Sequence, residues 1–202
     1  LESSSAASDV YKRQDDEYMF TITQEIENNS GENIEVFPYR LIKRINTPDT
    51  INFFILHEGL ISLINDELLE KNYDDIADDC NSSMQTKKEF CDNKTQGGWL
   101  GFTDKYWMSA LIPDADQSIN VNYRYGNNGR DSYRAGYVGQ IYKINSGENI
   151  SYGGKLFVGA KKLNVLSAYD ENLSIPRFTD AIDWGWFSSV SYTHLTLPTN
   201  SR

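Results

Sequence analysis

The sequence is poor in the residue types that carry enzyme chemistry and metal binding. Its 202 residues include only two histidines and two cysteines, and the cysteines, Cys80 and Cys91, have no histidine near them in sequence. Two thiols alone make a poor zinc site. The chain also has no Gly-x-Ser-x-Gly, no His-Glu-x-x-His, no Walker-type loop and no Gly-x-Gly-x-x-Gly after a strand-like run. We therefore expect no catalytic site, no metal and no cofactor.

Basic residues and long apolar runs are also scarce. Lys and Arg number 19 against 29 Asp and Glu, which gives a formal net charge of −10, and no basic stripe is present. A nucleic-acid partner is therefore not expected. The most apolar run, residues 51–64, is interrupted by polar residues and a glycine, and it falls short of the roughly 18 apolar residues of a transmembrane helix. We expect the chain as written to be soluble.

The residues that are present favour β-structure. Aromatic residues make up 13% of the chain, a composition that suits packed strands. Apolar and polar residues alternate through residues 18–45 around a turn-forming run at 28–33. Further strand-like runs are residues 51–56, 60–64, 68–73, 119–125, 133–144 and 151–160. Because turns join the later runs with no helix between them, we predict an antiparallel β-sandwich.

The stretch 97–113, GGWLGFTDKYWMSALIP, is the centre of this pattern. Two aromatic-rich runs flank a short polar break, which predicts two strands joined by a tight turn. Asp104 and Lys105 in that break are expected to form a solvated turn pair. Gly98 and Gly101 are expected where the backbone passes close to the large neighbouring rings.

The same stretch resembles the signature run in the large periplasmic domain of YidC-type membrane protein insertases. Residues 18–48 and 155–187 resemble that family too, and the resemblance covers about residues 15–187. It implies the later part of that domain, a large β-sandwich (supersandwich) of the sugar-epimerase and carbohydrate-binding kind. It also implies a non-catalytic periplasmic domain of a bacterial inner-membrane protein that helps membrane proteins insert and fold. The partners implied are nascent membrane proteins and the Sec translocon.

A stand-alone carbohydrate-binding or sugar-epimerase-like sandwich is the alternative. Such epimerases use a pair of histidines and a glutamate as general acid and base. His57 lies beside Glu58, but His194 falls in the last residues of the chain, outside the region of resemblance. We therefore expect that the chain is not an enzyme.

The pattern changes at Lys161. Leu163, Leu166 and Tyr169 are spaced for one helical face, and a second short segment runs through residues 178–187, so we expect short C-terminal helices. The apolar residues of this second segment, which we expect to contact the membrane surface or a partner, are Phe178, Ile182, Trp184, Trp186 and Phe187. Tryptophans suit a membrane interface, and packing of the segment on the sandwich is the alternative.

Residues 74–96 are polar and are expected to form a solvated loop, because their acidic cluster lacks the spacing of a calcium loop. Cys80 and Cys91 lie in this loop. In an oxidising compartment we expect a disulfide between them, and in cytosol two free thiols. Residues 1–14 and 188–202 share no pattern with the interior. We interpret both ends as foreign tails that make few packed contacts with a domain at residues 15–187.

Overall fold

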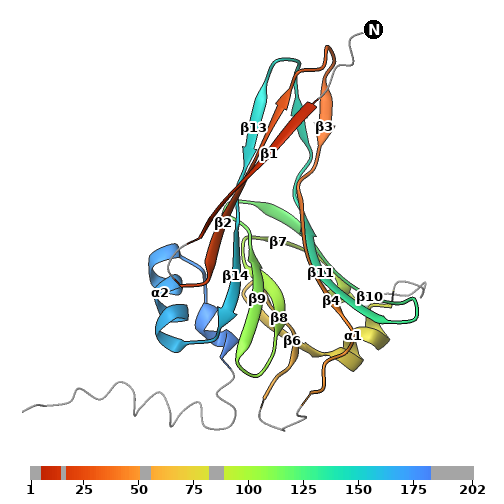
Figure 1. The fold of residues 1–202 in the computed structure, drawn as a ribbon, viewed down its shortest axis with the longest axis vertical. Helices are drawn as coiled ribbons and strands as arrows, with labels where there is room; N and C mark the ends of the chain where they lie inside the picture. Colours follow the sequence, from red (N-terminus) through yellow and green to blue (C-terminus); the bar gives the residue numbers. More distant parts are fainter. Residues whose placement is uncertain (1–5, 15–16, 51–55, 82–88, 183–202) are drawn as a thin grey trace, which may run out of the picture.

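The computed structural model describes residues 6–14, 17–50, 56–81 and 89–182, in which antiparallel strands dominate (Figure 1). The larger sheet has the order β1 (Ala6–Gln14), β2 (Met19–Asn28), β14 (Lys155–Ala160), β9 (Trp107–Ile112), β8 (Trp99–Thr103), β5 (Gly59–Ile64), β6 (Glu67–Asn72), and β13 (Asn149–Tyr152) also pairs with β2. The smaller sheet has the order β4 (Tyr39–Ile45), β11 (Asp131–Val138), β10 (Ser118–Asn127), β7 (Asp92–Gln96). A further pair joins β3 (Ile34–Val36) and β12 (Tyr142–Ile144), and the helices are α1 (Tyr73–Asp79), η1 (Glu89–Cys91), α2 (Leu163–Leu173) and η2 (Phe178–Ala181). The predicted antiparallel β-sandwich with short C-terminal helices is confirmed.

Strand β5 shows how the larger sheet builds two cores. All of its residues are buried, because both faces of the strand are covered. Leu60 and Ile64 belong to the core between the two sheets, whereas Ile61 and Leu63 belong to the core beneath α2 and η2. Successive side chains of a strand point to opposite faces of the sheet. This double coverage explains why the strand is a continuous apolar run and not an alternating one.

The core between the sheets includes a buried polar contact. The hydroxyl of Tyr123 in β10 donates a hydrogen bond to Oγ of Ser62 in β5 at 2.9 Å. Burial raises the pKa of Tyr123 well above its ordinary value, so the hydroxyl stays protonated and remains a donor. The bond satisfies two polar atoms that would otherwise be costly to bury, and it joins the two sheets.

The second core is centred on Trp99 in β8, which is fully buried. Its ring lies 5.4 Å from the ring of Phe178 in η2, and the ring of Phe178 lies 5.5 Å from that of Phe157 in β14, both in edge-to-face arrangements. Trp99 Nε1 donates to the backbone oxygen of Pro176 at 3.0 Å. The C-terminal part of the described chain is therefore fastened to the larger sheet.

Helix α2 covers the same core. Of the residues predicted to share its buried face, Leu166 and Tyr169 are buried and Leu163 is half-buried, so the predicted helix and its orientation are confirmed. Val165 is buried as well. The hydroxyl of Tyr169 donates to the backbone oxygen of Glu17, which ties the helix to the start of β2.

The prediction of a solvated loop at residues 74–96 is wrong, because this segment contains α1, η1 and β7. Asn72 begins the helix: its side-chain oxygen accepts a hydrogen bond from the backbone N–H of Asp75 at 2.8 Å. Asp74 and Asp75 lie in the first turn, where the helix dipole favours negative charge. Ile76 is buried on the inner side, so the acidic cluster is the beginning of an amphipathic helix.

The sequence also predicts few contacts for residues 1–14, yet β1 pairs with β2 from Ala6 opposite Asn28 to Gln14 opposite Phe20. Backbone pairing uses N–H and C=O groups that residues of almost every type carry, so it does not require the alternating pattern that the sequence lacks. The expectation of few contacts is therefore wrong for β1. The interpretation of both ends as foreign stays a prediction, and residues 188–202 and 51–55 lie outside the described residues.

The two glycines of the central hairpin lie where neighbouring backbone carbonyls approach closely, not where large rings do as the sequence predicted. A Cβ at Gly101 in β8 would lie 1.9 Å from the carbonyl oxygen of Ser109 in the neighbouring strand β9. A Cβ at Gly98 would lie 2.2 Å from the carbonyl oxygen of Leu63, and Gly98 has a φ of +85°. Close approach of neighbouring strands, together with a left-handed turn, therefore requires glycine at these positions.

Candidate functional site

The outer face of the smaller sheet carries exposed apolar side chains. Along β4 the residues alternate, so that Ile42 packs against the core whereas its neighbours on either side point outward. The exposed, outward-facing residues of the strand are Tyr39, Leu41, Lys43 and Ile45. Phe37, just before the strand, is 58% exposed. Contiguous exposed apolar residues are typical of surfaces that contact another molecule, so this face is a candidate interaction surface.

Three cations cross this face in what we call the cationic row: Lys43 in β4, Arg134 in β11 and Arg124 in β10. The strand register places Lys43 opposite Arg134, and Arg134 opposite Arg124. Like charges directly opposite each other destabilise a sheet, so the row is not explained by stability. Arg124 is compensated by an ion pair with Asp92. In contrast, the side chains of Lys43 and Arg134 form no hydrogen bond or ion pair with any residue that the structure describes.

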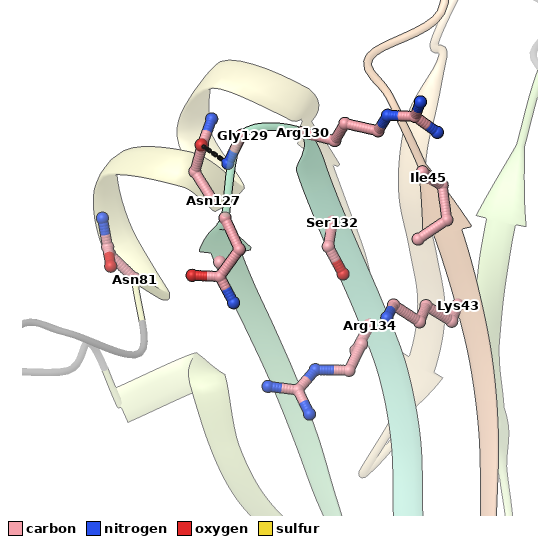
Figure 2. Close-up of a pocket in the computed structure, with 10 residues that line it drawn as sticks. Lys43, Ile45, Asn81, Asn127, Gly129, Arg130, Ser132 and Arg134 are labelled. Atoms are coloured by element: carbon pink, nitrogen blue, oxygen red, sulfur yellow. Dashed lines mark hydrogen bonds between the residues drawn. The ribbon is translucent and has the colours of Figure 1, made fainter.

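A pocket of about 580 Å³ lies at the Lys43 end of the row, and it has no aromatic side chain in its lining. Figure 2 shows Lys43 reaching from β4 toward Arg134, Arg130 extending from the β10–β11 hairpin on the side of Ile45, and Asn81 on the opposite wall. Two smaller hollows, of about 170 and 390 Å³, continue along the same face. Arg134 lines the first and second hollows, and Arg124 lines the second and third. Because the three hollows share lining residues along the cationic row, we call them together the groove.

The hairpin that forms one wall of the pocket is ordered by Asp131. Its carboxylate accepts hydrogen bonds from the hydroxyl of Tyr125 at 2.7 Å, the amide of Asn127 at 2.7 Å and the hydroxyl of Thr47 at 3.0 Å. These bonds, that of Tyr125 most, hold the pKa of Asp131 below its ordinary value. The side-chain oxygen of Asn127 accepts in turn from the backbone N–H of Gly129 (dashed in Figure 2). The wall is therefore held in place by its own hydrogen bonds.

A buried disulfide lies next to Arg124, at one end of the cationic row. Cys80 and Cys91, both fully buried, are joined with their Cα atoms 5.7 Å apart, a separation normal for a disulfide. The carbonyl of Cys80 accepts from the backbone N–H of Tyr125 at 2.8 Å, and the carbonyl of Cys91 accepts from Nη1 of Arg124 at 2.9 Å. The bridge thus connects the end of α1 to η1, and the carbonyls of both cysteines hydrogen-bond to β10, the strand that carries Arg124.

Asp104 is not part of a solvated turn pair, as the sequence suggested. Both of its carboxylate oxygens accept from Nη1 of Arg44, at 2.9 and 2.8 Å, so the turn of the central hairpin is bridged to the inner face of β4. The two residues lie sixty positions apart in the chain, and no local pattern signals the pair. Arg44 is an inward-pointing charge on an edge strand, a feature that discourages edge-to-edge association.

Of the C-terminal residues predicted to contact a membrane or a partner, Phe178 is instead a core residue. Its side chain is fully buried against Trp99 and Phe157, which is a correction to the predicted surface role. Ile182 is half-buried and packs against the same core. The other three, Trp184, Trp186 and Phe187, lie outside the described residues, so their role stays a prediction.

A second exposed aromatic surface lies at the tip of the β8–β9 hairpin, which we call the aromatic tip: Lys105, Tyr106 and Trp107. Tyr106 and Trp107 are 63% and 58% exposed. The ammonium of Lys105 lies 5.0 Å from the centre of the Tyr106 ring, and the backbone N–H of Lys161 donates to the backbone carbonyl of Tyr106 at 2.8 Å. Figure 1 shows the hairpin tip and η2 at the same end of the molecule. Sequence reasoning missed this surface, because a tyrosine and a tryptophan at the start of a strand read as core residues.

His57, the histidine that a sugar-epimerase function would need, contacts the backbone at the start of β5. Nε2 of His57 lies 2.8 Å from the backbone oxygen of Leu60, a structural contact at the start of β5. His194 lies outside the described residues. Within the described ranges there is no group of three or more His, Cys, Asp or Glu side chains placed to hold a metal ion, and no helix has the length and apolar character needed to cross a membrane.

Comparison with known proteins agrees with the family resemblance of the sequence. The model of the YidC periplasmic domain family matches residues 4–193. Among similar curated proteins, the membrane protein insertase YidC of Dinoroseobacter shibae is 38% identical over 86% of this chain, and those of Rickettsia canadensis and Paracoccus denitrificans are 39% and 36% identical over 88% and 90%. The chain covers only 28%, 30% and 29% of those three proteins. This chain therefore belongs to the YidC periplasmic domain family.

Proposed function

We propose that this chain is a non-catalytic periplasmic module of an insertase in the bacterial inner membrane, where it assists the insertion and folding of membrane proteins. The observation that carries the proposal is the family match over residues 4–193, together with relatives that are named membrane protein insertases. The open groove on the smaller sheet supports a role in contacting other polypeptides. Nascent membrane proteins and the Sec translocon are the partners that this role implies.

A graft into a relative tests the proposal. In the Paracoccus denitrificans insertase, the segment that matches this chain would be replaced by residues 4–193, the range of the family match, and a second protein would lack the segment altogether. We expect the graft to insert a reporter membrane protein more efficiently than the deletion, as measured by protease protection of a reporter loop in cells depleted of their own insertase. A graft that reaches the membrane in normal amounts and performs no better than the deletion would contradict the proposal.

We further propose that the aromatic tip faces the membrane surface. Tyr106 and Trp107 offer rings that suit the headgroup region, and Lys105 and Lys161 add positive charge beside them. The same end of the molecule carries η2, after which the predicted membrane-contacting residues follow in sequence (Figure 1).

Replacing Trp107 by serine is expected to weaken binding of the full chain to vesicles of phosphatidylethanolamine and phosphatidylglycerol about tenfold. The variant loses the free energy that is gained when the exposed indole ring moves from water into the membrane interface. The measurement is cosedimentation over a range of lipid concentrations. The matched control is Ile141→Ser, which removes a side chain of similar exposure (64%) just before β12 and should leave vesicle binding unchanged. If the Trp107 variant bound vesicles as tightly as the parent, the proposal that the aromatic tip faces the membrane surface would be contradicted.

His57→Ala is expected to change no reaction rate, because the chain is proposed not to be an enzyme. Mutarotation of common aldoses, followed by polarimetry, should proceed at the uncatalysed rate with the parent chain and with the variant. Turnover by the parent that disappears in the variant would favour the sugar-epimerase alternative.

A further inference from the structure

The cationic row is the feature that the stability of the fold does not explain. Three positive side chains are opposed across adjacent strands of a chain whose net charge is −10. The charge of Arg124 is neutralised by an ion pair with Asp92. The nearby carboxylate of Asp131 accepts three hydrogen bonds from other side chains. Lys43 and Arg134 are left without such a partner among the described residues. Arrangements that break a local stability rule without compensation are expected at functional sites.

The groove combines this charge with apolar and amide side chains. Its second hollow is lined by Phe37, Tyr39 and Leu41 next to Arg134. Asn122 lines the second and third hollows, and its amide is a donor and acceptor suited to a peptide backbone. The surface therefore offers cations for carboxylates, apolar contacts for side chains and amides for main-chain groups. That combination fits a polypeptide better than it fits a free anion.

We propose that the groove binds acidic, extended segments of the proteins that the insertase handles, namely the segments that cross to the periplasmic side. This inference rests on the proposed function. Segments translocated across the inner membrane are poor in Lys and Arg, because positive residues are retained on the cytoplasmic side. Their carboxylates are consequently less often neutralised by neighbouring cations. A cationic groove on a periplasmic module is complementary in charge to this class of segment.

The geometry agrees with an extended chain. Carboxylates at alternate positions of an extended peptide are about 7 Å apart on one face, and the row from Lys43 to Arg124 spans three strands, or about 10 Å. Two or more such carboxylates therefore reach the long side chains of the row together. Arg124 is held by the carbonyl of Cys91 and by Asp92, which positions one end of the row.

The test uses the full chain and a fluorescein-labelled peptide of about 12 residues, with glutamate at every second position and serine or valine between, followed by fluorescence anisotropy. The double variant Lys43→Gln and Arg134→Gln should bind the peptide about tenfold more weakly than the parent. A peptide with glutamine in place of each glutamate should bind the parent about as weakly. Raising the salt from about 50 mM to about 300 mM should weaken binding of the acidic peptide to the parent.

The matched control is the double variant Lys143→Gln and Lys162→Gln, which removes the same charge from exposed positions outside the groove. It should bind the peptide as the parent does. Equal weakening by both double variants would show an effect of net charge only and would overturn the inference, as would unchanged binding by the groove variant. If the groove variant lost binding to phosphatidylglycerol vesicles and kept binding to the peptide, the groove would be a lipid site and the inference would also be overturned. The graft experiment leaves the groove unaltered, so failure of peptide binding and failure of the proposed function are separate results.

Discussion

Replacing Phe178 by alanine is expected to destabilise the fold by about 3–5 kcal/mol, the usual cost of truncating a buried phenylalanine. The ring is fully buried and lies edge-to-face against both Trp99 and Phe157, so its removal leaves a cavity bounded by the larger sheet. The surrounding strands are paired on both sides and cannot collapse into such a space. Urea unfolding of the full chain, followed by far-ultraviolet circular dichroism, measures the loss.

The matched control for this prediction is Val158→Ala. Val158 neighbours Phe157 in the same strand, and its side chain is 47% exposed. An exposed substitution of this kind is expected to change stability by no more than about 0.5 kcal/mol. If Phe178→Ala changed stability as little as the control, Phe178 would not be a core residue. The surface role that the sequence predicted for it would then be supported.

Removing the disulfide is expected to cost about 3 kcal/mol of stability. Cys80 and Cys91 are separated by 11 positions in sequence, and closing a loop of that size removes about this much chain entropy, as free energy, from the unfolded state. The double variant Cys80→Ala and Cys91→Ala deletes the bridge without placing new polar groups in a buried site. Its urea midpoint should fall, and binding of the acidic peptide should weaken because the segment whose backbone carbonyl at position 91 accepts from Arg124 is no longer tied to the end of α1.

The reductant provides the control for this experiment. Dithiothreitol should lower the urea midpoint of the parent toward that of the double variant, and it should leave the double variant unchanged. A parent that unfolds at the same urea concentration with and without reductant would show that the bridge contributes nothing to stability under these conditions.

The local patterns of the sequence determined much of the architecture. Alternation and turn residues predicted the central hairpin and the strands on both sides of it, because side-chain direction in a strand depends only on position along the chain. The spacing of Leu166 and Tyr169 predicted a helix and its buried face for the same reason. Helix α1 escaped prediction because its buried residues are few and its acidic first turn resembles a solvated loop.

Only the tertiary structure decided where the candidate surfaces lie. The cationic row joins Lys43 to residues of β10 and β11 that come much later in the chain, and its order depends on strand register. Register is set by long-range packing, so no stretch of sequence displays it. The same is true of Phe178, which reads as a surface aromatic until Trp99 and Phe157 are placed around it. The sequence determined most of the strands and which family the chain belongs to, whereas pairing with distant strands decided β1 and β7, and packing decided which charged and aromatic side chains remain available to a partner.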